Sequence, residues 1–343
     1  MDMEQSSILN HIVIEESSAT PKYKQIINSI ISAIDKGMLK RGDRLPSLNT
    51  LYYNLEISKD SVEKSYNHLR KIGVVNAFPG KGYYIANTDV KETDCIFLLF
   101  NKLSQHKKII YDAFVNTLGA GYTVDFYIYN DDPFLFRRLL KKQGNYAYYV
   151  IIPPLDDDKD TYTLINEIPK NKLVLLDRSY PYIEGEYAAA YQNFRSDIYN
   201  ALVQAKETLS KYHTIKVIIP NDALFSKEII KGCMFFCQDY AFCYKAVKQL
   251  PEEPIKEGEA FICLTEADLV LLVERLLNLG LKPGRQVGII SYNETPLKKI
   301  ILEGITTIST DFHEMGRMAA QLIKDRSLKQ VEIPFYLKLR YSL

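Results

Sequence analysis

The segment from residue 21 to residue 86 carries three short helix-forming patterns followed by two β-forming runs around a glycine-rich turn. Between Pro21 and Lys36, isoleucines recur at helical spacing, and Gly37 follows as a stop signal. Three helices and a hairpin in about 65 residues leave few arrangements that bury a single core. This segment therefore constrains the fold more than any other part of the chain.

Two hydroxyl residues predict where the second and third helices begin. Ser47 follows Leu45-Pro46 and precedes a short apolar run, whereas Ser58 precedes a longer apolar stripe. We expect the buried stripe of the third helix to consist of Val62, Tyr66, Leu69 and Ile72 and to stop at Gly73. The turn at residues 79–82 separates two short β-forming runs, as in a hairpin.

Charge is distributed unevenly along the chain. Residues 21 to 86 hold 11 Lys and Arg against 5 Asp and Glu, a net charge of +6. The whole chain carries only +1, so the remainder carries −5. A basic segment of this size suits a module that binds phosphates, which a sensor body does not need.

Four motifs in this segment occur in a recognisable order: Pro-x-Tyr-x-Gln-Ile, Gly-Asp-x-Leu-Pro-Ser, Ser-Lys-Asp-Ser-Val and Gly-Lys-Gly-Tyr. On these motifs, residues 21 to 86 resemble the GntR family of winged helix-turn-helix (α+β) regulators. The resemblance implies that the helix from Lys59 enters the major groove of DNA. It also implies that the Gly80-Lys81-Gly82 tip touches the flanking minor groove or the backbone.

The residues expected to contact DNA combine cations, short hydroxyls and glycines that permit close approach. They are Ser47, Ser58, Lys59, Ser61, Lys64, Gly80, Lys81 and Gly82. Asn49 and Glu63 stand where many family members carry Arg, so direct base readout is not assigned to either position.

The length of 343 residues exceeds that of a usual single core and predicts at least two domains. We expect an N-terminal arm at residues 1–20, the DNA-binding domain at 21–86, a polar linker at 87–94 and a second domain at 95–343. In that second domain, seven apolar runs alternate with helical patterns, which predicts an α/β fold with parallel sheets.

The second domain resembles the sugar-sensing domain of LacI/GalR repressors, a two-lobed fold related to periplasmic binding proteins. The residues that carry the resemblance are Leu175-Leu176-Asp177-Arg178, Tyr191-Gln192-Asn193, Phe261-Ile262-Cys263, Ile289 to Asn293, Thr306-Thr307-Ile308 and Glu314-Met315-Gly316. A GntR head on such a body is similar to arabinose-type repressors.

By this resemblance, Asp177 and Arg178 form a charged pair that grips sugar hydroxyls, with Ser104 and His106 on the loop after the first strand. Thr265 and Asn293 reach in from the other lobe. The chain departs from the family pattern at Ile229, where Arg is frequent, and at Thr265-Glu266 and Asn293, where Asn-Asp and Asp are usual. These departures leave the sugar unidentified and a different ligand open.

Other features narrow the class of protein. The apolar runs are too short to span a bilayer and the first residues lack a signal-peptide pattern, so we expect a cytoplasmic protein without a membrane partner. The five cysteines have no paired CxxC spacing and are interpreted as thiols rather than as disulfides or metal ligands. The sequence predicts no metal, no cofactor and no catalytic residues.

These observations predict a dimeric transcriptional regulator that binds operator DNA and responds to a small effector such as a monosaccharide. The main form of the hypothesis is a repressor of a carbohydrate-utilisation operon that the sugar releases. Two alternatives remain at this point. One is a GntR fusion enzyme that uses pyridoxal phosphate, and the other is a carbohydrate-binding protein without a DNA function.

Overall fold

The computed structural model describes residues 9, 11–16, 18, 20–88, 94–141, 146–155, 159–220, 227–248 and 250–343. The expected arm (1–20) and the expected linker (87–94) are therefore only partly described. Among the described residues, no helix has the length and apolar composition that crossing a bilayer requires.

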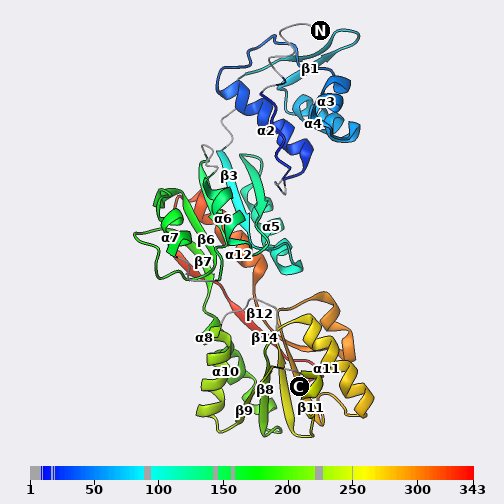
Figure 1. Cartoon of the computed structure of the whole chain (residues 1–343), viewed down its shortest axis with the longest axis vertical. Helices are drawn as coiled ribbons and strands as arrows, with labels where there is room; N and C mark the ends of the chain where they lie inside the picture. The colour runs from blue at the N-terminus through cyan, green and yellow to red at the C-terminus, as the bar shows by residue number, and fades with distance from the viewer. Residues whose placement is uncertain are drawn as a thin grey trace. The chain divides into compact units, whose positions relative to one another are not determined.

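The head of the protein contains three helices followed by a two-stranded hairpin, in the order that the sequence predicts (Figure 1). The elements are α2 (Lys22–Asp35), α3 (Leu48–Leu55), α4 (Lys59–Lys71), β1 (Val75–Phe78) and β2 (Gly82–Ile85). One detail of the prediction was wrong, because Ile72 is 46% exposed and not part of the buried stripe. Helix α4 ends at Lys71, so Ile72 lies at the C-cap, and Gly73 turns the chain away with a φ of 77°.

The core of the head joins all of its elements. Ile26 and Ile30 of α2, Leu51 of α3 and Leu69 of α4 are fully buried in one apolar cluster. Ile12, which belongs to the expected arm, is also buried in that cluster. Part of the arm therefore contributes to the packing of the head.

The remaining strands form two six-stranded sheets. The first has the strand order β13-β7-β6-β5-β3-β4 and the second has the order β14-β12-β11-β10-β8-β9. In the first sheet, β3 pairs in parallel with β4 and β5, and β7 pairs in parallel with β6 and β13. In the second sheet, only the β12–β14 pair is antiparallel.

The elements of the first sheet are β3 (Asp94–Phe100), β4 (Tyr122–Ile128), β5 (Tyr148–Ile151), β6 (Leu173–Arg178), β7 (Ala188–Gln192) and β13 (Gln330–Glu332). Helices α5 (Gln105–Leu118), α6 (Pro133–Lys141), α7 (Lys159–Asn166) and α12 (Phe312–Lys324) accompany them. Helices α5 and α12 approach closely at Gly316, where a Cβ atom would lie 2.3 Å from the carbonyl oxygen of Ile110.

The elements of the second sheet are β8 (Thr214–Ile218), β9 (Cys243–Val247), β10 (Glu259–Cys263), β11 (Val287–Tyr292), β12 (Thr306–Thr310) and β14 (Phe335–Lys338). Helices α8 (Phe194–Gln204), α9 (Lys206–Leu209), α10 (Lys227–Asp239) and α11 (Glu266–Leu279) accompany them. Figure 1 shows α8 and α10 beside each other, with α11 across the sheet.

Alternation along the central strands explains why helices are needed on both faces of this sheet. Ala260 and Ile262 of β10 are buried in the cluster that includes α8 and α10. Phe261 and Cys263 of the same strand are buried in the cluster that includes α11. A strand that is buried on both faces has an uninterrupted run of apolar residues in its sequence. The burial of both faces of β10 therefore confirms that its apolar run was correctly interpreted as a buried strand.

All seven predicted strands are present, but the sequence did not predict β7, β9, β12, β13 and β14. Strand β7 begins with three alanines, which have low strand propensity. Strand β12 is Thr-Thr-Ile-Ser-Thr, whose polar residues are nevertheless buried. Strand β9 lies at the edge of the sheet and is largely exposed, so no apolar run marks it.

Candidate functional site

Two serines fix the starts of α3 and α4, and both were expected from the sequence. Ser47 Oγ accepts a hydrogen bond from the Thr50 backbone amide at 3.1 Å, and Ser58 Oγ accepts one from the Ser61 amide at 3.3 Å. The Ser58 and Ser61 hydroxyls also lie 2.9 Å apart. These hydroxyls therefore have a structural role in capping, and their exposed position also suits a contact to a phosphate.

A buried tyrosine connects α4 to the segment that precedes α3 and to the hairpin. Tyr66 of α4 is 1% exposed, and its hydroxyl donates a hydrogen bond of 2.8 Å to the carbonyl oxygen of Pro46. Its ring also packs edge-on against Tyr83 of β2 at 4.7 Å. Burial raises the pKa of Tyr66, so this hydroxyl remains a donor. One side chain thus ties α4 both to the start of α3 and to the hairpin.

The first turns of α4 present two exposed lysines. The Lys59 ammonium lies 5.5 Å from the centre of the Tyr52 ring, and Lys64 lies 3.4 Å from the carboxylate of Asp60. The Lys64–Asp60 pair is solvent-exposed, so little free energy holds it together. Both ammonium groups are available to bind phosphates or guanine edges.

The hairpin tip presents a third exposed lysine between two glycines. Gly80 and Gly82 have φ angles of 72° and 103°, which glycine adopts without strain. The Lys81 amide donates to the Phe78 carbonyl at 3.0 Å, which closes the turn. Arg44 lies beside this tip, because a Cβ on Gly82 would stand 3.5 Å from its Nε. Arg44 is exposed, and it was not among the DNA contacts predicted from the sequence.

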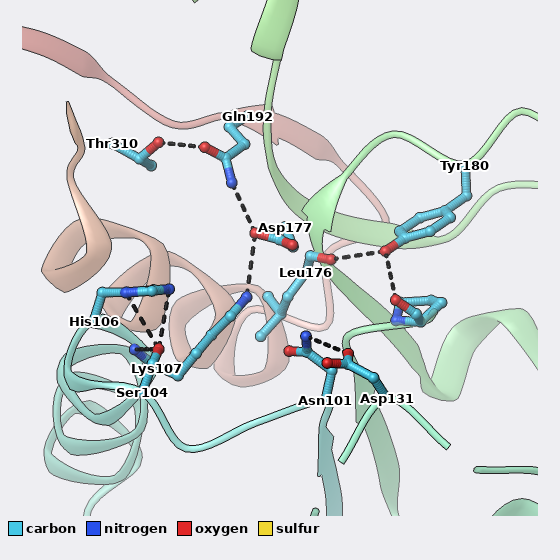
Figure 2. A network of polar contacts seen from close by, with 11 residues as sticks. Asn101, Ser104, His106, Lys107, Asp131, Leu176, Asp177, Tyr180, Gln192 and Thr310 are labelled. Atoms are coloured by element: carbon cyan, nitrogen blue, oxygen red, sulfur yellow. Dashed lines mark hydrogen bonds and ion pairs between the residues drawn. The ribbon is translucent and has the colours of Figure 1, made fainter. Parts of the chain in front are cut away.

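A second group of polar side chains gathers at the carboxyl ends of three strands, around Asp177 (Figure 2). Lys107 of α5 lies 3.3 Å from Asp177 Oδ1, and Gln192 of β7 donates to the same oxygen at 2.7 Å. The hydroxyl of Thr310, at the end of β12, donates to Gln192 Oε1. Lys107, Gln192 and Thr310 are all buried. We call Lys107, Asp177, Gln192 and Thr310 the strand-end network.

His106 lies next to this network. Burial and the nearby charge of Lys107 lower its pKa to about 4, although Asp177 acts in the opposite direction. Its ring packs 4.8 Å from Phe312, and both ring nitrogens lie within 3.2 Å of Ser104 Oγ. A neutral imidazole both donates and accepts hydrogen bonds, which suits an uncharged hydroxyl ligand.

Asp177 and Arg178 have different surroundings. Arg178 Nη2 donates to the Pro154 carbonyl at 3.1 Å, and its guanidinium lies 4.8 Å from the centre of the Tyr180 ring. Asp177 belongs instead to the strand-end network and has a φ of 86°. Successive residues of a strand point to opposite faces, which accounts for the separation.

Thr265 and Asn293 follow β10 and β11. Thr265 caps α11: its Oγ1 accepts from the Asp268 amide at 3.2 Å and donates to the Asp268 carboxylate at 2.6 Å. Asn293 has a φ of 62°, and its backbone amide donates a hydrogen bond of 2.8 Å to the backbone carbonyl of Ile308 in β12. Lys298 is 2% exposed, and its ammonium donates a hydrogen bond of 2.6 Å to the backbone carbonyl oxygen of Asn293.

Four polar atoms at the end of β11 and just after it are buried without a hydrogen-bond partner among the described residues. They are Ser291 Oγ, the Tyr292 hydroxyl, Asn293 Oδ1 and Thr295 Oγ1. A buried polar group that lacks a partner costs about 1 to 3 kcal/mol, so such groups cluster where a ligand or water completes them. This observation supports Asn293 as a ligand contact.

Lys107, Gln192 and Thr310 were not predicted from the sequence as candidate site residues. Gln192 and Thr310 are the last residues of β7 and β12, two strands that are not marked by an apolar run in the sequence. Lys107 directly follows His106, a predicted site residue. A rule that collects every polar side chain at a strand end would have found Gln192 and Thr310, had the two strands been predicted.

Two cysteines of the second domain, Cys233 and Cys237, lie in α10. Cys233 and Cys237 are buried in the α8–α10 core, and burial raises the pKa of Cys237 to about 12. Their thiols therefore stay protonated and pack as small apolar groups. Within the described ranges, no group of three potential ligand side chains could hold a metal ion.

Comparison with known proteins matches two parts of the chain to described families. Residues 22–85 match the family described as bacterial regulatory proteins, gntR family, and residues 223–335 match the periplasmic binding protein-like domain. The HTH-type transcriptional repressor YtrA of Bacillus subtilis is 34% identical over 110 residues, which cover 32% of this chain and 81% of that protein.

Solved structures are similar to the larger part of the chain. A probable maltose operon transcriptional repressor, malR, from Staphylococcus aureus has a TM-score of 0.60 at 17% identity, covering 74% of this chain and 99% of that one. A LacI family transcriptional regulator from Lactobacillus casei with bound glucose has a TM-score of 0.57 at 15% identity, covering 73% and 99%. At these identities the likeness concerns the fold.

Proposed function

Because this chain belongs to the GntR family of bacterial regulatory proteins, we propose that its head reads an operator and that its second domain controls the head in response to a sugar. The chain is a DNA-binding transcriptional regulator with a LacI-type, periplasmic-binding-protein-like second domain. The families it matches contain regulators, and no aminotransferase domain is among them. The nature of the effector and the direction of its effect are the proposed part.

The arrangement of the head supports the reading of DNA. Lys59, Lys64 and Lys81 are exposed, and Ser47 and Ser58 lie at helix starts, where backbone amides also attract phosphates. In this proposal α4 enters the major groove, while Lys81 and Arg44 contact the backbone beside it. A dimer that binds two half-sites on successive turns completes the proposal.

One observation carries the proposal of a neutral, hydroxyl-rich effector: the strand-end network meets unpartnered polar atoms at the neighbouring end of β11. The Asp177 carboxylate accepts hydrogen bonds, and the Gln192 side-chain amide both donates and accepts them. Asn293 Oδ1 has no partner among the described residues. His106 remains neutral at physiological pH because its pKa is lowered to about 4. Paired donors and acceptors of this kind recognise sugar hydroxyls.

The repressors that resemble this fold also inform the choice of ligand. One is named for a maltose operon and another holds glucose. We therefore propose a mono- or disaccharide as the effector and loss of operator binding as its result, with Ser104, His106, Asp177, Arg178, Thr265 and Asn293 as the proposed contacts. Contact by Thr265 requires its hydroxyl to serve both the cap of α11 and the ligand.

The experiment begins with a duplex selected by the full-length protein from a random library. Binding of that duplex is then measured by fluorescence anisotropy with and without glucose or maltose. We expect selective binding that one of the sugars weakens. A protein that shows no preference among duplexes would contradict the DNA part. Operator binding that responds to neither sugar, combined with no thermal stabilisation by either, would contradict the effector part.

A further inference from the structure

A cavity lies between α8 and the segment where β13 leads into β14. It has a volume of about 330 Å³ and is lined by residues of α8 and of residues 332–335. Asp197, Asn200 and Gln204 line it from α8, and Glu332 and Phe335 line it from the connection. None of these residues belongs to the proposed effector contacts. The volume falls at the lower end of the range for small-molecule sites.

The cavity contains a carboxylate that has no ion pair among the described residues. Asp197 is 7% exposed, and its Oδ2 has no hydrogen-bond partner in the part of the chain that the structure describes. Burial, together with the charge of Glu332, raises the pKa of Asp197 to about 7. A buried carboxylate is costly unless a cation or several donors compensate it. No Lys or Arg is among the described residues that line this cavity.

A second unpartnered polar atom lies close by. The Tyr292 ring packs 5.8 Å from Phe335, which lines the cavity, and the Tyr292 hydroxyl is buried without a partner among the described residues. Burial raises the pKa of Tyr292 and the charge of Asp197 raises it further, so the two groups are close enough to interact. An ammonium group offers donors to both oxygens at once.

We propose that this cavity is a second ligand site and that it binds a small organic cation, of the primary-amine class. Asp197 and Glu332 supply the negative charge, and the Phe335 ring supplies an aromatic wall, which attracts cations. Asn200 and Gln204 supply amides for polar substituents. No three His, Cys, Asp or Glu side chains among the described residues are placed to share a metal ion, and the size and apolar wall of this cavity suit an organic cation better than a bare ion.

The test uses calorimetry and thermal unfolding of the full-length protein with n-butylamine and, as a neutral match, n-butanol. We expect n-butylamine to bind and to raise the unfolding temperature, whereas n-butanol does neither. Asp197→Asn should weaken amine binding at least about tenfold, which corresponds to roughly 1.4 kcal/mol. Glu332→Gln, at an exposed position, should weaken it less.

Two controls make the outcome decisive. Glu167→Gln removes an exposed carboxylate elsewhere and should leave amine binding unchanged. Glu186→Gln, which removes another exposed carboxylate outside the cavity, should also leave it unchanged. Equal binding of n-butylamine and n-butanol would overturn the proposal. So would amine binding that survives both Asp197→Asn and Glu332→Gln, or calcium chloride binding while the amine does not bind.

Discussion

The head and the second domain place their candidate functional side chains in opposite ways. In the head, Lys59, Lys64 and Lys81 are exposed and depend on local features, namely two caps and one turn. In the second domain, Lys107, Gln192 and Thr310 are buried and come from three elements that are far apart in sequence. A polyanion needs an accessible cationic surface, whereas a small neutral ligand needs enclosed, mutually paired groups.

The prediction with the largest expected effect concerns the strand-end network of the second domain. Asp177→Ala leaves Lys107 buried without its ion pair and removes the acceptor of Gln192. We expect the free energy of unfolding of the second domain to fall by about 3 kcal/mol, because a buried charge that loses its partner is strongly destabilising. Urea denaturation measures it, with Glu167→Ala as the matched exposed control. A change as small as that of the control would show that the network does not stabilise the fold.

Next in size is the removal of exposed cations from the head. Lys59→Ala combined with Lys64→Ala should weaken operator binding about thirtyfold, or roughly 2 kcal/mol, with no loss of folding stability. The slope of log affinity against log salt should fall by about 1.8, since two phosphate contacts disappear. Anisotropy titrations at several salt concentrations measure both quantities. The control is Lys299→Ala with Lys329→Ala, which removes two exposed lysines of the second domain. Unchanged affinity and slope would contradict the role of α4.

The same contrast explains what could be predicted from the sequence. The caps at Ser47 and Ser58, the stop at Gly73 and the glycines of the hairpin act within a few residues of themselves. Local physics therefore gave the three helices and the hairpin in the right order. The error at Ile72 arose because a periodic pattern does not show where the last helical turn ends.

The site in the second domain could be predicted only in part. Asp177 lies near the end of β6 and Asn293 directly follows β11, and both strands have clear apolar runs, so these positions at the strand ends were visible as candidates. Gln192 and Thr310 end β7 and β12, which are made of alanines and threonines, so their strands were not predicted. The contact between them joins residues 118 positions apart, and no periodicity in one sequence encodes such a pairing.

A smaller effect is expected in the pH dependence of the free energy of unfolding, to which His106 contributes. The pKa of His106 is lowered from 6.5 to about 4 by burial and by Lys107 and Lys298, although Asp177 opposes this. Between these values the unfolded chain binds a proton that the folded chain does not. The stability that His106 contributes is therefore complete above pH 6.5 and is lost as the pH falls toward 4.

We expect this loss to reach about 1.5 kcal/mol, after allowance for partial exposure of the ring. Asp197 has a raised pKa and acts in the opposite direction, so the wild type alone does not isolate His106. The measured quantity is the unfolding free energy of the wild type minus that of His106→Gln, at pH 7 and at pH 4.5. A difference that is independent of pH would show that His106 is not held neutral by its surroundings.

The smallest predicted effect compares one cap from each region. Ser58→Ala and Thr265→Ala each remove a side chain that accepts from a backbone amide at the start of a helix. Each should lower the free energy of unfolding by about 1 kcal/mol, and Thr265→Ser should restore the cap.

The functional effects of these cap substitutions should differ. Ser58→Ala should also weaken operator binding, because its hydroxyl is exposed and proposed to contact a phosphate. If Thr265→Ser preserves stability but weakens the sugar response, the Thr265 side chain has a second role beyond capping. If both stability and response are preserved, the hydroxyl alone accounts for this position.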